Sequence, residues 1–175
     1  MWTRATWHEC ADELEDLSQR FRDAFWGRHH GSVWPRHADD EAEMLQSSRD
    51  AVKMLRAIAL AVRSEQDFAL VPDSMAVVGA IKRRNAVDGD ADEAKRRHGY
   101  EGLLDTEGYE PLTLREALNR IAHADPRKAD YYVGPLDRCH DLLLFGDNRG
   151  ERWFAAVSML ELPAAVRALP DVKLA

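Results

Sequence analysis

Apolar residues recur at every third or fourth position in two long segments near the start of the sequence, which is the spacing of one face of a helix. The first segment covers residues 7–25, and the second covers residues 45–62, just after acidic residues that suit a helix N-terminus. Gly27 is expected to end the first helix, and the second is expected to begin near Asp39 or Asp40. Two long amphipathic helices joined by a loop predict an antiparallel hairpin, which is half of a helical bundle.

Shorter segments with less regular patterns follow this hairpin. A third helix is expected from about Asp73 to Arg84, because its apolar residues keep a helical spacing. Residues 86–92 interrupt it, and residues 92–99 are expected to add another turn or two. Residues 99–111 contain three glycines and show no period, so they predict a long loop of the kind that is often functional or mobile.

The segment 114–125 predicts a helix with clear boundaries. Thr113 and Glu116 have the spacing of a capping box, in which each side chain binds a backbone N–H at the helix start. Pro126 disfavours helical geometry at the residue before it and so ends the helix. On a helical wheel the apolar face contains Leu114, Leu118 and Ile121, and the polar stripe beside it contains Arg115, Asn119 and His123.

The pattern changes near the C-terminus, where two apolar runs between residues 140 and 159 flank the segment Gly146–Gly150. This arrangement predicts a β-hairpin with a five-residue loop, which residues 131–133 could extend by a strand. Trp153 and Phe154 are neighbours on a strand, so one is expected to face the core and the other to face outward. A short closing helix is expected after them, with Pro163 in its first turn.

The whole pattern predicts one domain over residues 1–175, mainly α. It would be a helical bundle with a C-terminal β-hairpin at about 139–159 and a short closing helix. The chain is long enough for a core, and its 45% hydrophobic and 31% charged residues are typical of a folded protein. The longest apolar runs are far shorter than the ~20 residues that cross a bilayer. No CxxC pair links Cys10 and Cys139, and the first residues lack the apolar run of a signal peptide, so a cytoplasmic location is expected.

The residues N-R-I-A-H at 119–123 resemble the core of the motif in HEPN domains, a family of helical bundles common in prokaryotic defence and toxin systems. Many members carry the form R-N-x-I-A-H, and the resemblance implies a metal-independent cleavage of RNA by the arginine and the histidine. It also implies a dimer or pseudo-dimer, because two copies of the motif commonly meet across such a cleft. This sequence has Leu118 where that arginine would stand.

The loss of the arginine matters because cleavage of RNA through its own 2′-hydroxyl needs proton transfer and a fixed cation. His123 could transfer a proton near neutral pH, whereas Leu118 cannot supply the charge. Arg115 or Arg120 would have to act as the phosphate cation, with Asn119 beside them on the same helix. The net charge of −7 argues against a broad electrostatic grip on nucleic acid.

The leading interpretation is therefore a non-catalytic, HEPN-like binding or regulatory module, whose setting by resemblance is bacterial defence or a toxin–antitoxin system. A protein partner or a homodimer is expected, RNA is a possible ligand, and no membrane contact or cofactor is expected. The first alternative is a metal-independent RNase using His123 with Arg115 or Arg120. The second is a metal-dependent enzyme using the loop from His29 to His37, whose histidines and acids lack any recognised ligand spacing. The acidic segment 88–93 lacks the late glutamate of a calcium loop.

Overall fold

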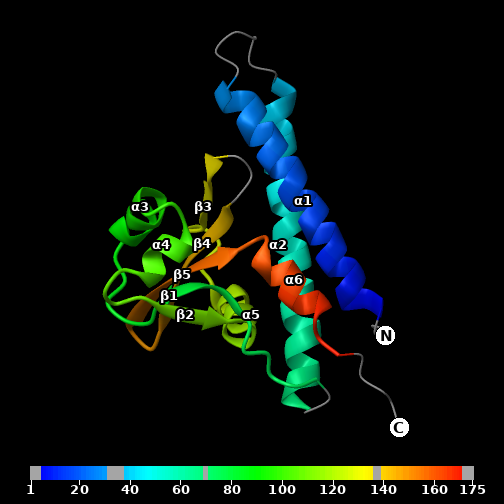
Figure 1. The fold of residues 1–175 in the computed structure, drawn as a ribbon, viewed down its shortest axis with the longest axis vertical. Coiled ribbons are helices and arrows are strands. Elements are labelled where there is room, and N and C mark those ends of the chain that lie inside the picture. The colour runs from blue at the N-terminus through cyan, green and yellow to red at the C-terminus, as the bar shows by residue number, and fades with distance from the viewer. Residues whose placement is uncertain (1–4, 31–37, 69–70, 136–138, 171–175) are drawn as a thin grey trace.

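The computed structural model describes residues 5–30, 38–68, 71–135 and 139–170, and its N-terminal part is a long helical hairpin. Helices α1 (Ala5–His30) and α2 (Ala38–Asp67) pack side by side and antiparallel (Figure 1). The predicted hairpin is confirmed, and most of its apolar seam is buried, but Leu45 at the start of the second seam is exposed. One correction concerns Gly27, because α1 continues through it to His30.

Five antiparallel strands form a single sheet beside this hairpin. They are β1 (Val77–Lys82), β2 (Glu110–Thr113), β3 (Asp130–Val133), β4 (His140–Asn148) and β5 (Glu151–Ser158). Their order across the sheet is β2-β1-β5-β4-β3. The expectation of a mainly α bundle with only a C-terminal hairpin is therefore wrong, because the hairpin is the centre of a larger sheet.

The third helix predicted from Asp73 to Arg84 is also wrong, since this segment contains β1. Val78 to Ile81 are buried in succession, because helices cover both faces of the sheet at this strand. A strand that is buried on both faces loses its alternation of polar and apolar residues, and a short apolar run then fits helix and strand equally well. Gly79 has no room for a Cβ, which would meet the carbonyl oxygen of Ala156 on β5.

The predicted β-hairpin is confirmed, but its turn is shorter than expected. Asn148 pairs with Glu151, so the loop contains two residues, Arg149 and Gly150, in place of five. Both have positive φ angles, 55° and 86°, as a two-residue turn with the twist of the flanking strands requires. The third strand expected from residues 131–133 is present as β3.

Four shorter helices complete the structure: α3 (Gly89–Arg96), α4 (Tyr100–Leu104), α5 (Leu114–His123) and α6 (Glu161–Arg167). The predicted loop 99–111 is wrong in part, because it contains α4 and the start of β2. The predicted capping box is also absent: Thr113 makes no side-chain cap bond, and Glu116 pairs with Arg83 and Arg120.

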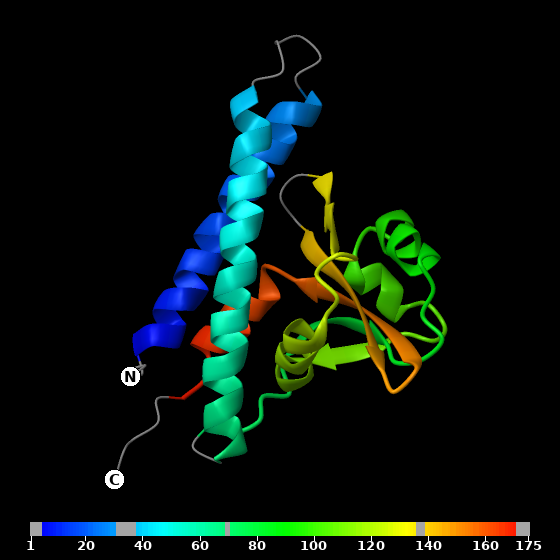
Figure 2. The ribbon, with the colours of Figure 1, turned by 180° about the vertical axis from the view of Figure 1, so that it is seen from behind.

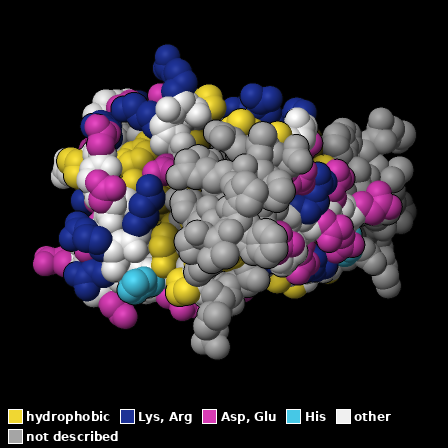
Figure 3. Space-filling model, turned by 90° about the horizontal axis from the view of Figure 1, so that it is seen from above, with side chains coloured by type: hydrophobic (Ala, Val, Ile, Leu, Met, Phe, Trp, Pro, Cys, Tyr) yellow, Lys and Arg dark blue, Asp and Glu magenta, His cyan; other side chains and the backbone are white. Residues whose placement is uncertain are grey.

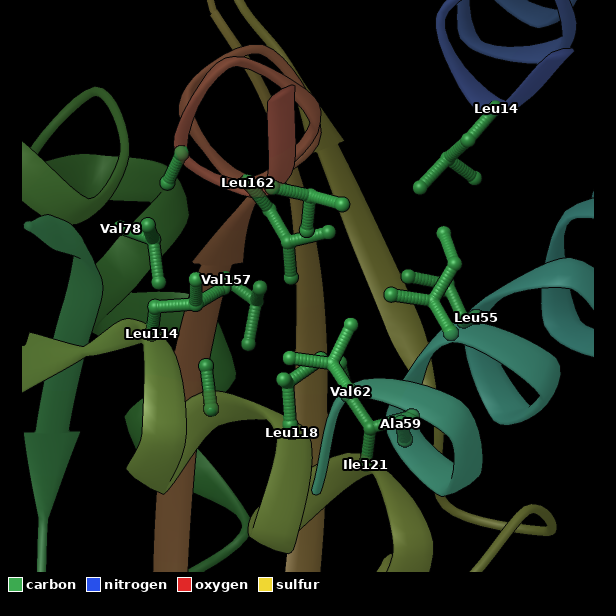
Figure 4. Close-up of a cluster of buried hydrophobic side chains, with 14 of the residues drawn as sticks. Leu14, Leu55, Ala59, Val62, Val78, Leu114, Leu118, Ile121, Val157 and Leu162 are labelled. Carbon is green, nitrogen blue, oxygen red and sulfur yellow. The ribbon is translucent and has the colours of Figure 1, made fainter. Parts of the chain in front are cut away.

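The sheet is the middle of three layers. The hairpin, α5 and α6 cover one face, while α3 and α4 cover the other (Figures 1 and 2). Leu55 and Val62 of α2, Leu118 of α5 and Val157 of β5 meet in the larger core (Figure 4). Trp153 is buried in this core and Phe154 in the smaller one, so the expectation that one of the two faces outward is wrong.

Candidate functional site

Helix α5 contains the candidate site residues that the HEPN resemblance indicates, and its apolar face packs as predicted. Leu114, Leu118 and Ile121 are buried in the larger core (Figure 4). The side chain of Leu118 is fully buried among apolar neighbours. The position where the family has an arginine therefore faces the interior of the protein in this chain.

Arg115 lies on the exposed side of α5 and is held by two carboxylates. Its guanidinium donates to Asp73 at 2.6 Å and to Asp67 at 3.3 Å. These partners come from the end of α2 and the segment before β1. The hydrogen bond to Asp73 and the charge of Asp73 raise the pKa of Arg115, which stays a cation with two anions beside it.

Arg120 points to a different part of the molecule, toward the sheet. The centre of its guanidinium lies 4.9 Å from the centroid of the Trp153 ring, and its Nη2 donates to Glu116 at 3.0 Å. Only 16% of the Arg120 side chain is exposed. Stacking on an aromatic ring and an ion pair give Arg120 a structural role that accounts for its position.

Asn119 and His123 complete the predicted stripe, and the structure separates them. Asn119 is half-buried and lines an open hollow of about 410 Å³ together with Arg63, Thr113 and Arg115. His123 is exposed and does not line that hollow. The structure thus brings Arg115 and Asn119 together and leaves Arg120 and His123 outside.

The structure gives no geometric support to the metal-binding alternatives. His37 lies outside the described residues, as do the side chains of His29 and His30. Within the described ranges no group of three or more His, Cys, Asp or Glu side chains could hold a metal ion. In the acidic segment 88–93, buried Asp90 accepts hydrogen bonds from Lys82 at 2.9 Å and from the Tyr109 hydroxyl at 2.6 Å, so it ties α3 to the sheet.

A cleft that the sequence patterns did not indicate lies between the helical hairpin and the sheet. It has a volume of about 200 Å³ and is bordered by α1, α2, β4 and the segment 126–131. A smaller hollow of about 60 Å³ extends it along α2, and the two share Val52, Leu55 and Leu142. Most of the lining is apolar.

The floor of this cleft contains a buried polar pair, Ser18 of α1 and His140 of β4. Their Oγ and Nδ1 atoms are 2.7 Å apart. The imidazole of His140 stacks on Phe21 with ring centroids 5.0 Å apart, and Tyr131 meets Phe21 edge-on. Burial, aided by the positive charge of Arg22, lowers the pKa of His140 to about 3. The imidazole is therefore neutral near pH 7.

Ser18 and His140 are 122 residues apart in the sequence, and only the packing of α1 on the sheet joins them. Ser18 interrupts the apolar seam of a helix, and His140 begins an apolar strand; either residue alone looks like an ordinary polar position. One sequence signal remains: each is a polar residue at a position that periodicity assigns to the core.

A second buried polar group lies on the opposite face of the sheet. Asp141 is fully buried, and its Oδ2 accepts a hydrogen bond from the Tyr100 N–H at 2.6 Å. Burial raises the pKa of Asp141 to about 6. The other oxygen, Oδ1, has no hydrogen-bond partner. This group anchors α4 to the sheet.

The fold defined by these elements is a three-layer α+β domain with an antiparallel sheet and a polar pair at the base of an apolar cleft. No protein-family model, curated protein or solved structure matches the chain. None of the described helices is both long and apolar enough to cross a bilayer.

Proposed function

We propose that the chain is a non-catalytic binding module and that the cleft beneath the helical hairpin is its ligand site. The observation that carries this proposal is an apolar cleft of about 200 Å³ with a neutral, hydrogen-bonding imidazole in its floor. Small-molecule sites are typically concave and apolar with a few well-placed polar groups. A cytoplasmic location and a protein partner or homodimer, in a defence or toxin–antitoxin setting, belong to the same proposal and rest on composition and on the HEPN resemblance.

The cleft is suited to binding more than to catalysis. Ser18 and His140 have the distance of a nucleophile and its base, but the strongly lowered pKa of His140 makes it a weak proton acceptor. Acyl transfer also needs donors that stabilise an oxyanion, and Arg22, whose charge acts on His140, donates to the backbone oxygen of Ser18. The hydrogen bond between Ser18 and His140 therefore serves to hold and orient the imidazole.

Binding at the cleft is tested with toluene as the probe, followed by saturation-transfer NMR. Ala51 lines the cleft, so Ala51→Leu places three extra carbon atoms in it and should weaken toluene binding at least tenfold. Arg49→Leu adds the same side chain at an exposed position of α2 and is the matched control. Equal toluene binding by the wild type and Ala51→Leu, with both proteins folded, would place the probe elsewhere and refute the proposal.

A metal-independent RNase is the second candidate, favoured by the hollow that Arg115 and Asn119 share. It needs His123 as the proton-transfer group, with Arg115 or Arg120 as the cation. The test is cleavage of mixed RNA in EDTA by the wild type and by His123→Ala at equal concentration. We expect no cleavage by either. Cleavage that is lost in His123→Ala would make this helix an active site and replace the binding proposal.

A further inference from the structure

The protonation state of the cleft histidine follows from its serine partner. The Ser18 side chain is 1% exposed, so its hydroxyl proton needs an acceptor within the protein. A serine within a helix often donates to the carbonyl four residues earlier, but the only hydrogen bond that the described residues offer the Ser18 hydroxyl is the 2.7 Å contact with Nδ1 of His140. The hydroxyl therefore donates to Nδ1, which is unprotonated.

A neutral imidazole carries one proton, so that proton lies on Nε2. Among the described residues, no group accepts a hydrogen bond from Nε2, and His140 lines the cleft. The ring is held in place by Phe21, which stacks on it at an interplanar angle of 8°. The cleft thus contains a fixed N–H donor that has no partner among the described residues.

The remaining lining carries little net charge. Asp130 is the one carboxylate that borders the cleft among the described residues, and its Oδ2 is paired with Lys95 at 2.5 Å. The Ser47 hydroxyl donates to Glu43 at 3.2 Å. The described lining contains no cation, and its one carboxylate is already paired, so an ionised ligand would lose its hydration with little compensation and a neutral ligand is favoured.

The size of the cleft limits the ligand further. An apolar cavity of about 150 Å³ is enough for a benzene molecule. The 200 Å³ of the cleft, with the 60 Å³ hollow beside it, accommodates one aromatic ring with a short substituent.

We propose that the ligand of this cleft is a small neutral aromatic compound with a hydrogen-bond acceptor, such as an aryl ketone or amide, and that Nε2–H of His140 binds the acceptor. This inference rests on the proposed function, because it requires the cleft to be the ligand site. It assigns the binding site, the class of ligand and the atom that selects it.

Two probes of nearly the same shape test the role of the donor. Acetophenone and α-methylstyrene differ in one position, where a carbonyl oxygen replaces a methylene group. The variant Ser18→Ala/His140→Phe removes both members of the polar pair and keeps an aromatic ring, which avoids an unpaired buried group. Acetophenone should bind the double variant at least fivefold more weakly than the wild type, the factor of one neutral hydrogen bond. The affinity for α-methylstyrene should stay the same or rise.

A measurement on the wild-type protein keeps the inference testable if the double variant does not fold. The ¹⁵N resonances of the His140 ring distinguish the two tautomers, and we expect Nε2 to be protonated and to shift on addition of acetophenone but not of α-methylstyrene. A proton on Nδ1, or equal responses to both probes, would overturn the inference and leave the cleft as a binding site. Binding of neither probe to the wild type would instead overturn the proposed function itself.

Discussion

The charge of the buried Asp141 carboxyl group depends on the fold. Its pKa of about 6 lies above the ordinary value of 3.8 because burial disfavours the anion. The folded protein then binds the proton more tightly than the unfolded chain does. Protonation of Asp141 therefore stabilises the fold, fully below about pH 4, and this contribution is lost as the pH rises through about 6.

Replacement of Asp141 by asparagine removes this titration and keeps an oxygen that can accept the Tyr100 N–H. The variant Asp141→Asn should be more stable than the wild type at pH 7 by about 2 to 3 kcal/mol, and the difference should disappear below about pH 4. Urea unfolding of both proteins at intervals between pH 3.5 and pH 7.5 measures this difference in the free energy of unfolding. A difference in free energy that does not change with pH would show that Asp141 keeps its ordinary pKa.

Leu118 is the residue where the HEPN resemblance and the packing disagree. Its side chain is fully buried, so Leu118→Ala should lower the free energy of unfolding by about 2 to 5 kcal/mol through lost contacts and a cavity. His123→Ala on the exposed side of the same helix should change it by less than about 0.5 kcal/mol. Equal effects of the two substitutions in chemical denaturation would contradict this placement of α5.

The sequence pattern placed Leu118 and His123 correctly, but it could not predict contacts between residues that are far apart in the sequence. Helical periodicity placed Leu118 inside and His123 outside, because both depend only on neighbours along one helix. The pair of Ser18 and His140 depends on how α1 packs against β4, which no local spacing encodes. The partners of Arg115, which lie 42 and 48 residues earlier in the chain, were hidden for the same reason.

At the scale of elements, the amphipathic helices could be predicted from the sequence, but strands that are buried on both faces could not. The long helices α1 and α2 each bury one face, so their polar and apolar residues alternate with the helical period. Strand β1 buries both faces, and strand β2 has only four residues, so neither shows the period of a strand. The hairpin β4–β5 was found because a turn signal separates its two apolar runs.

A close contact across that hairpin leads to a further prediction. Gly146 of β4 pairs with Trp153 of β5, and the indole lies so close that a Cβ at position 146 would overlap it. Arg120 stacks on the same indole, so the ring has little freedom to move. Gly146→Ala should therefore lower the free energy of unfolding by about 1 to 3 kcal/mol.

The control for this substitution is Gly89→Ala at the start of α3, where a Cβ would meet no other atom within 4 Å. This variant should be neutral or slightly stabilising, since alanine favours a helix more than glycine does. Thermal and urea unfolding of both variants provide the comparison. A neutral Gly146→Ala would mean that the indole is not held against β4.

For the molecule as a whole, the arrangement of charge bears on RNA binding. The net charge is −7, and basic and acidic side chains are interspersed on the face shown in Figure 3. The sequence contains two Lys-Arg-Arg segments, at residues 82–84 and 95–97, which do not form a basic patch. Arg83 pairs with Glu110 and Glu116, while Arg96 and Arg97 both pair with Glu93. In the described part of the chain, these paired arginines offer little free charge to replace the counterions of a phosphate backbone.

We therefore expect no binding of a mixed single-stranded RNA at 150 mM salt and micromolar protein, measured by fluorescence polarisation of a labelled RNA. Charge reversal of the shared partner, Glu93→Lys, would free Arg96 and Arg97 and should produce weak, salt-dependent binding. Asp125→Lys makes the same change of charge beside Arg127 on another part of the surface and serves as a control. Tight binding by the wild type would contradict this account.

The strand order has a consequence for the way the protein is made on the ribosome. Strand β5, which joins β1 to β4 in the middle of the sheet, is the last of these five strands to leave the ribosome. At typical rates of synthesis, roughly 5 to 20 s separate the end of α2 from the end of β5. During that interval the nascent helical hairpin has no complete sheet to cover its apolar side, because β5 links the β1–β2 pair to the β4–β3 pair. Any chain that stops before β5 would keep this surface exposed and depend on chaperones to remain unaggregated.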